Sequence, residues 1–106
     1  MVPTVFARVA RYEVSRDQLE QAVAAFGEAG RQIEHLEGFA GGYVLVDNED
    51  GRTMTLTLWE NAVALENSER QARNLRRQAA ETAGGSVLSV ESFEVAQELA
   101  AQPSRA

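Results

Sequence analysis

The strongest constraint on the fold is the order in which two hydrophobic periods alternate along the chain. Strand-like alternation is expected in four segments and helical spacing in two, in this order: 5–14 (strand), 15–37 (helix), 42–47 (strand), 53–59 (strand), 61–83 (helix), 86–95 (strand). The Asn48–Gly51 turn signal joins the two middle strands directly. With right-handed crossovers, this order predicts an α+β, ferredoxin-like βαββαβ fold whose four-stranded antiparallel sheet carries both helices on one face.

The ends of the expected helices carry recognisable signals. Ser15 and Gln18 have the spacing of a capping box, and Gly38 is placed to end the first helix in a left-handed conformation. Asn61 is the expected N-cap of the second helix, which Gly84 ends. These signals fix where each helix is predicted to lie between its strands.

The length and composition limit the chemistry. With 106 residues the chain fits one domain, 1–106, with a core at about 5–95 and a C-terminal tail at 96–106, which is expected to add a helical turn before Pro103. The sequence holds no cysteine and a single histidine, His35, so we expect no metal site and no cofactor. His35 lies opposite the apolar stripe of its helix, where we expect it to face water.

The charge balance argues against polyanionic partners. The net charge is −6 and the pI about 4.7, whereas nucleic acids and anionic membranes attract clustered cations. No segment approaches the roughly 18 consecutive apolar residues of a membrane span. We therefore expect a cytoplasmic protein that binds neither nucleic acid nor membrane.

The sheet is predicted to have no polar face. Two helices cover only one face of a four-stranded sheet, and the other usually turns polar where it meets water. The strand at 53–59 instead places Met54, Leu56 and Leu58 on one side. An apolar face of this kind predicts a homodimer that packs sheet against sheet, forming a dimeric α+β barrel.

The stretch TMTLTLWENAVALENSE, a threonine-rich strand leading into Leu-Trp-Glu and a helix, resembles the antibiotic biosynthesis monooxygenase (ABM) family of dimeric α+β barrels. The resemblance extends from about Val5 to Val95 and includes Glu37-Gly38-Phe39 before the second strand. It implies a pocket between the sheet and the helices, with Trp59 on the pocket wall. The residue pattern itself fits equally well with Trp59 as a core aromatic at the junction of strand and helix.

The resemblance also implies possible activities, and the sequence departs from both. Haem-degrading relatives use an asparagine on the first strand and a histidine on the second helix, and neither is present here. Relatives that oxidise aromatic polyketides with molecular oxygen and no cofactor carry an asparagine four residues before the tryptophan and a tyrosine on the following helix. Those positions hold Thr55 and Leu65 here.

Other candidate residues come from the residue pattern itself. Tyr43 is a candidate pocket residue because it is expected to lie on the same side of the sheet as Trp59. Arg8 lies mid-strand among apolar residues and needs a partner, for which Glu91 and Glu94 are candidates. Arg76 lies at the edge of the second helix's apolar stripe, from which it could meet a carboxylate or enolate in a pocket. The pocket candidates are therefore Trp59, Thr55, Tyr43, Leu65, Arg76 and Arg8.

Three functions remain open at this point. The first is binding of a small apolar or aromatic molecule near Trp59. The second is cofactor-independent oxygenation of a phenolic or quinone-like substrate. The third is a structural dimer whose pocket is filled by its own side chains, among them Leu65, Phe6 and Trp59.

Overall fold

The first strand lies inside the sheet, as expected for a segment with apolar residues on both faces. The computed structural model describes residues 5–101, and the elements follow the predicted order. Their bounds are β1 (Phe6–Glu13), a 3-10 turn (Arg16–Gln18), α1 (Leu19–Ile33), β2 (Phe39–Asp47), β3 (Arg52–Trp59), α2 (Ala62–Thr82) and β4 (Ser86–Glu94). The fold is thus the predicted ferredoxin-like α+β fold.

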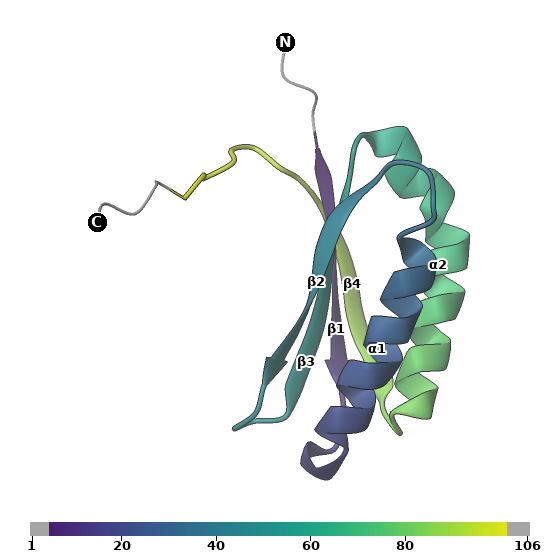
Figure 1. Cartoon of the computed structure of the whole chain (residues 1–106), viewed down its shortest axis with the longest axis vertical. Helices are drawn as coiled ribbons and strands as arrows, with labels where there is room; N and C mark the ends of the chain where they lie inside the picture. Colours follow the sequence, from purple (N-terminus) through teal and green to yellow (C-terminus); the bar gives the residue numbers. More distant parts are fainter. Residues whose placement is uncertain (1–4, 102–106) are drawn as a thin grey trace.

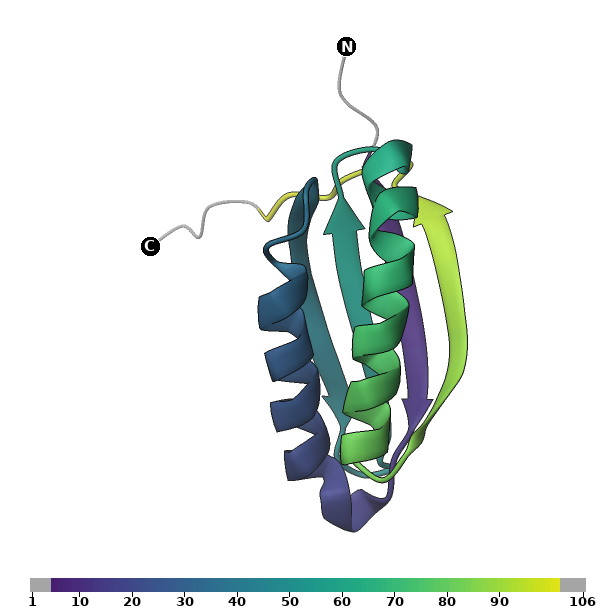
Figure 2. The ribbon, with the colours of Figure 1, turned by 90° about the vertical axis from the view of Figure 1, so that its right-hand side faces the viewer.

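The sheet has the strand order β2-β3-β1-β4, and every neighbouring pair is antiparallel. Both helices cover the same face (Figures 1 and 2). Helix α1 packs on β2 at one edge of the sheet, and α2 packs on β1 and β4. The opposite face carries no helix, so one side of the sheet is open (Figure 1).

The helix ends agree only in part with the sequence signals. Asn61 caps α2, because its side chain accepts a hydrogen bond from the Ala64 amide at 2.8 Å. The Ser15–Gln18 capping box does not form: no side chain caps this turn, and the Gln18 amide instead donates to the Ser15 carbonyl. Helix α1 ends at Ile33, a turn earlier than predicted, and Gly38 has the expected left-handed φ of 82°.

The core between sheet and helices forms two clusters. One surrounds Tyr12 and Phe26, whose ring centroids lie 4.1 Å apart, and includes alanines of both helices. The other surrounds Trp59, which is fully buried and packs edge-to-face on Phe39. The small side chains of α2 let this helix lie close to the sheet.

The chain after β4 runs away from the body of the domain (Figure 1). Residues 96–101 contain no helix, although the sequence suggested a helical turn before Pro103. Pro103 itself lies outside the described residues. Leu99 in this segment is 87% exposed.

Candidate active site between the sheet and helix α1

A pocket of about 420 Å³ opens between the sheet and α1. Its apolar walls include Phe26 and Ile33 of α1 and Phe39 and Val44 of β2. The strands β1 and β3 form its floor, and α2 reaches it with Ala72 and Arg76. This volume falls within the range of small-molecule sites.

The edge of the pocket at β2 depends on two adjacent glycines, Gly41 and Gly42. Gly41 and Gly42 lie within β2, where the register with β3 shifts between Phe39 and Gly41. A Cβ at Gly42 would come within 2.7 Å of the Leu56 carbonyl oxygen. The bulge therefore requires a small residue here, and it leaves the backbone of β2 bare at the pocket.

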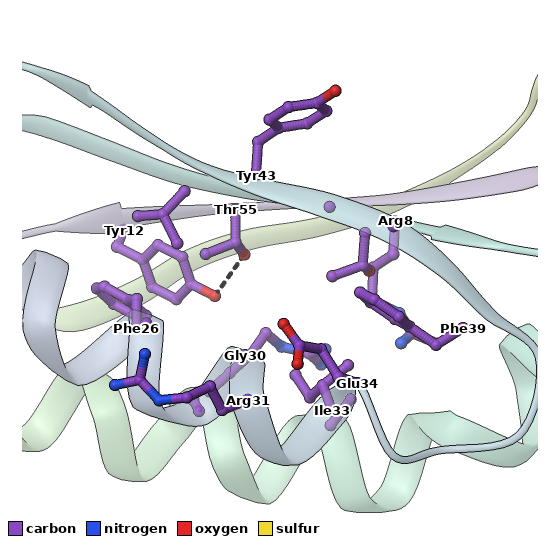
Figure 3. Close-up of a pocket in the computed structure, with 18 residues that line it drawn as sticks. Arg8, Tyr12, Phe26, Gly30, Arg31, Ile33, Glu34, Phe39, Tyr43 and Thr55 are labelled. Carbon is purple, nitrogen blue, oxygen red and sulfur yellow. Dashed lines mark hydrogen bonds between the residues drawn. The ribbon is translucent and has the colours of Figure 1, made fainter.

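Threonines of β3 place hydroxyl groups on the floor of the pocket. Alternation puts Thr55 and Thr57 on the helix-covered face, where both line the pocket. The Thr55 hydroxyl shares a 2.9 Å hydrogen bond with the Tyr12 hydroxyl (Figure 3). Burial raises the pKa of Tyr12, although Thr55 and Arg76 act in the opposite direction. Tyr12 is therefore a neutral phenol at physiological pH.

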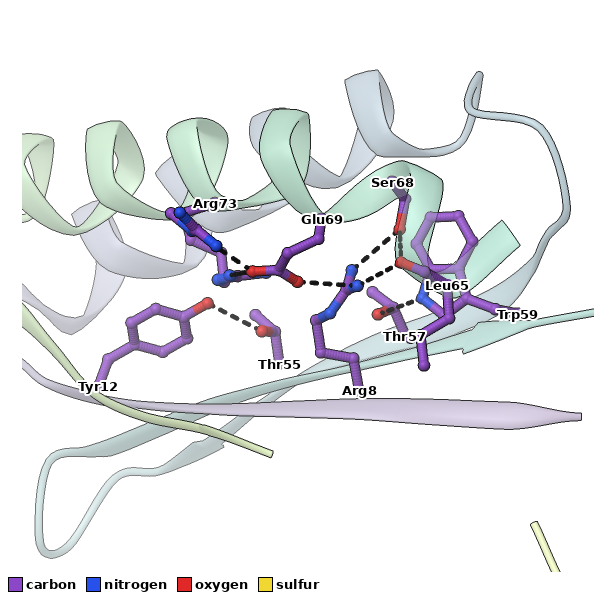
Figure 4. A network of polar contacts seen from close by, with 10 residues as sticks. Arg8, Tyr12, Thr55, Thr57, Trp59, Leu65, Ser68, Glu69 and Arg73 are labelled. Atoms are coloured by element: carbon purple, nitrogen blue, oxygen red, sulfur yellow. Dashed lines mark hydrogen bonds and ion pairs between the residues drawn. The ribbon is translucent and has the colours of Figure 1, made fainter. Parts of the chain in front are cut away.

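Arg8 of β1 enters the same face and is only 4% exposed. Its guanidinium donates to the Leu65 carbonyl oxygen at 2.7 Å and the Ser68 hydroxyl at 3.1 Å, and it pairs with Glu69 at 2.8 Å (Figure 4). Burial lowers the pKa of Arg8, Glu69 raises it, and Arg76 lowers it. The Arg8 guanidinium nevertheless stays charged at neutral pH.

The acidic partner of Arg8 is therefore on α2, and the predicted partners on β4 were wrong. Glu91 lies on the opposite face of the sheet, where it pairs with Arg11. Glu94 is level with Phe6 at the end of the strand, and no ion pair with Arg8 is formed. Glu69 instead reaches down from α2 and also contacts Arg76 at 2.8 Å.

Three of the six predicted pocket residues point into the pocket. Arg8, Arg76 and Thr55 line it. Trp59 and Leu65 are in the core behind it: the Trp59 indole donates to Thr57 at 3.0 Å and lies 5.6 Å from the Arg8 guanidinium carbon. Trp59 thus supports two residues of the pocket rather than forming its wall.

Tyr43 also borders the pocket, but its side chain lies on the other side of the sheet. Its ring points away from the pocket (Figure 3), and the residue is 66% exposed. The bulge in β2 contributes to this, because the pairing of β2 with β3 aligns Tyr43 with Leu56 rather than with a threonine. Tyr12, Phe26 and Phe39, which line the pocket, were not predicted as site residues, and neither was Glu69, which contacts the pocket residues Arg8 and Arg76. Only the packing of the helices on the sheet brings these side chains together.

Within residues 5–101, no group of three or more His, Cys, Asp or Glu side chains is placed to hold a metal ion. None of the helices in this part of the chain is long and apolar enough to cross a membrane. The expected cytoplasmic location stays a prediction.

The fold and the pocket together define a ferredoxin-like α+β domain with a ligand-sized cavity between its sheet and helices. The family model for antibiotic biosynthesis monooxygenase matches residues 5–80. The chain therefore belongs to this family, as its sequence resemblance indicated. Among curated proteins, none matches the sequence significantly.

Solved structures share the fold at low sequence identity. A conserved protein from Methanosarcina mazei Go1 has a TM-score of 0.69 and 13% identity, over 87% of this chain and 93% of that one. MupZ from Pseudomonas fluorescens has a TM-score of 0.68 and 16% identity, over 87% of this chain and 68% of that one. SnoaB, a cofactor-independent oxygenase from Streptomyces nogalater, has a TM-score of 0.64 and 16% identity, over 90% and 96% of the two chains.

Proposed function

We propose that this protein binds a small, flat, apolar or aromatic molecule in the pocket between α1 and the sheet. The observation that carries the proposal is the cavity itself, about 420 Å³ in volume, with Phe26 and Phe39 on its walls and hydroxyl groups on its floor. Sites with mostly apolar walls and a few converging polar groups are typical of small-molecule binding. A cavity of this size also argues against a dimer with a closed pocket.

The binding test uses the only tryptophan. Trp59 touches Phe39 and lies beside Arg8, and both of these residues line the pocket. A naphthalene-sized ligand is therefore expected to change its fluorescence in a saturable way, with a matching heat signal by calorimetry. Gly30→Leu, which places a side chain into the cavity, is expected to abolish binding. Ala24→Leu, on the exposed side of the same helix, is the control and should bind normally.

The proposal fails if no naphthalene-sized aromatic saturates the wild-type protein. It also fails if Gly30→Leu binds as well as Ala24→Leu, because the ligand would then lie elsewhere.

Oxygenation is the second candidate function, and membership of the monooxygenase family favours it. An anthrone-type substrate would be oxidised at its CH₂ group by O₂, giving a carbonyl group and one molecule of water, without any other oxidant. The Tyr12–Thr55 hydroxyl pair and the Arg8 and Arg76 cations would stabilise the enolate that reacts with O₂.

Oxygen uptake with anthrone tests this activity. One O₂ consumed per anthrone, together with a loss of at least about tenfold in Thr55→Val, would support it. Thr82→Val, at the exposed end of α2, is the matched control. Uptake no faster than in the absence of protein would contradict it.

We further propose that the open face of the sheet is covered by a second copy of the chain, as the sequence predicted. Apolar side chains cluster there: Tyr43, Leu45 and Phe93 are exposed in a single chain, and Met54, Leu56 and Leu58 are partly exposed. A contiguous exposed patch of this composition usually marks an interface. A two-fold axis through the patch would let the same side chains cover one another.

A further inference from the structure

Two buried guanidinium groups at the pocket share a single acid, Glu69, whose side chain is 32% exposed. The side chains of Arg8 and Arg76 are 4% and 7% exposed, and both line the pocket. Glu69 lies between them, with one carboxylate oxygen 2.8 Å from Arg8 and the other 2.8 Å from Arg76. Arg73 also approaches Glu69, at 3.6 Å, but it is 71% exposed. The buried end of the pocket therefore carries one uncompensated positive charge.

The other acids and bases around the pocket are at its mouth. Arg31 of α1 and Glu34, which directly follows this helix, line the pocket and are exposed to solvent, and Arg31 pairs with Glu28 on the surface. Water and salt screen exposed charges far more than buried ones. The carboxylate of Glu34 therefore offsets the buried charge only weakly.

Hydrogen-bond donors at the buried end are not all used. The Arg8 Nε is buried without a hydrogen-bond partner. The hydroxyls of Tyr12 and Thr55 make one hydrogen bond between them, so whichever donates, the hydrogen of the other remains free. Buried donors without acceptors are rare in native proteins, and an anion would satisfy them.

We propose that Arg8 and Arg76 form a subsite for an anionic oxygen, so that the ligand of the pocket is an aromatic acid. It would be a carboxylate, or a phenol or enol acidic enough to be ionised at neutral pH. The flat part of the molecule would lie between the aromatic walls, and its negative oxygen would face the guanidinium groups and the free hydroxyl hydrogen. This inference rests on the proposed binding function and adds the charge of the ligand.

Aromatic ligands of similar size and different charge test the subsite. Naphthalene-2-carboxylate and its neutral carboxamide have the same shape, and 2-hydroxy-1,4-naphthoquinone adds an ionised enol. In calorimetric titrations at low salt, we expect at least one of the two anions to bind about tenfold or more tightly than the amide, as charge-assisted hydrogen bonds allow. The anion whose affinity exceeds that of the amide by the larger factor shows whether the charge of the ligand comes from a carboxylate or from an ionised enol.

Two substitutions should move the affinity for the anion in opposite directions. Arg76→Met removes one cation and leaves the Arg8–Glu69 pair neutral, so the preference for the anion should fall to about twofold or less. Glu69→Gln keeps both cations and removes the compensating charge, so the anion should bind more tightly while the amide is unaffected. Arg77→Met, on the exposed side of α2, is the control and should behave as the wild type.

The outcomes separate the two proposals. If acid, enol and amide bind equally well to the wild type, the anion subsite is wrong and the binding pocket stands. If none of the three binds, both proposals are wrong. If Arg76→Met unfolds, as its circular dichroism would show, Glu69→Gln decides, and unchanged anion affinity in that variant overturns the subsite.

Discussion

Tyr12 makes the free energy of unfolding of the protein depend on pH in the alkaline range. Its pKa is raised by burial, so the native state holds the phenol proton at a pH where the unfolded chain has released it. The unfolded state then binds fewer protons, and the free energy of unfolding falls as the pH rises above about 10. Below that pH the contribution of Tyr12 is fully present.

Tyr12→Phe should remove this part of the pH dependence. The phenylalanine keeps the packing on Phe26 but loses the hydrogen bond to Thr55, which costs about 1 kcal/mol at neutral pH. Urea denaturation at several pH values between 7 and 11 measures both effects. The wild type is the comparison, and the prediction is wrong if it and Tyr12→Phe respond alike to pH values above 10.

At the scale of single residues, the sequence predicts which side chains are unusual for their position, but not which residues they contact. Arg8 was recognisable as a charge among apolar residues, and its burial bears this out. Its partner was not predictable, because Glu69 meets it only through the rotation and height of α2 over the sheet. For the same reason Trp59, the residue that stood out most, lies behind the pocket while Tyr12 lines it.

Two glycines inside α1 should lower its stability. Gly27 and Gly30 lie at the pocket, and a Cβ added to either would meet no atom within 4 Å. We therefore expect Gly27→Ala and Gly30→Ala each to raise the free energy of unfolding by about 0.5–1 kcal/mol, because alanine favours the helix. Chemical denaturation monitored by circular dichroism measures the change.

Gly38→Ala is the contrasting variant for this test. Gly38 has a positive φ, and its Cβ would collide with the Ala64 side chain, so this substitution should destabilise the fold. If Gly30→Ala also destabilises, α1 does not leave open space at the pocket.

At the scale of elements, the hydrophobic periods predicted the order of strands and helices, and the Asn61 cap formed as expected. Local signals failed where the tertiary structure competed with them. The Gln18 side chain, expected to close a capping box, lies beside Gly84 at the end of α2. The bulge in β2 was not predictable either, because two glycines fit a turn as well as a distorted strand.

At the scale of the whole molecule, strand alternation predicted which face of β3 is aliphatic, and the sheet leaves that face without helices. The pocket on the other face could not be predicted in the same way. The pocket lies between α1, α2 and the strands, and its volume depends on the glycines of α1 and the short side chains of α2. Spacing of this kind between elements has no local signal in the sequence.

The open face of the sheet leads to a prediction about the oligomeric state of the whole molecule. If a second copy covers it, light scattering should give twice the 11.6 kDa mass of one chain, and thermal stability should rise with protein concentration. Leu56→Glu places a charge at the centre of the face and should give a folded monomer. Val63→Glu, at an exposed position of α2, should remain dimeric. A wild-type mass of 11.6 kDa at micromolar concentration would rule the dimer out, and a dimeric Leu56→Glu would place the interface on another surface.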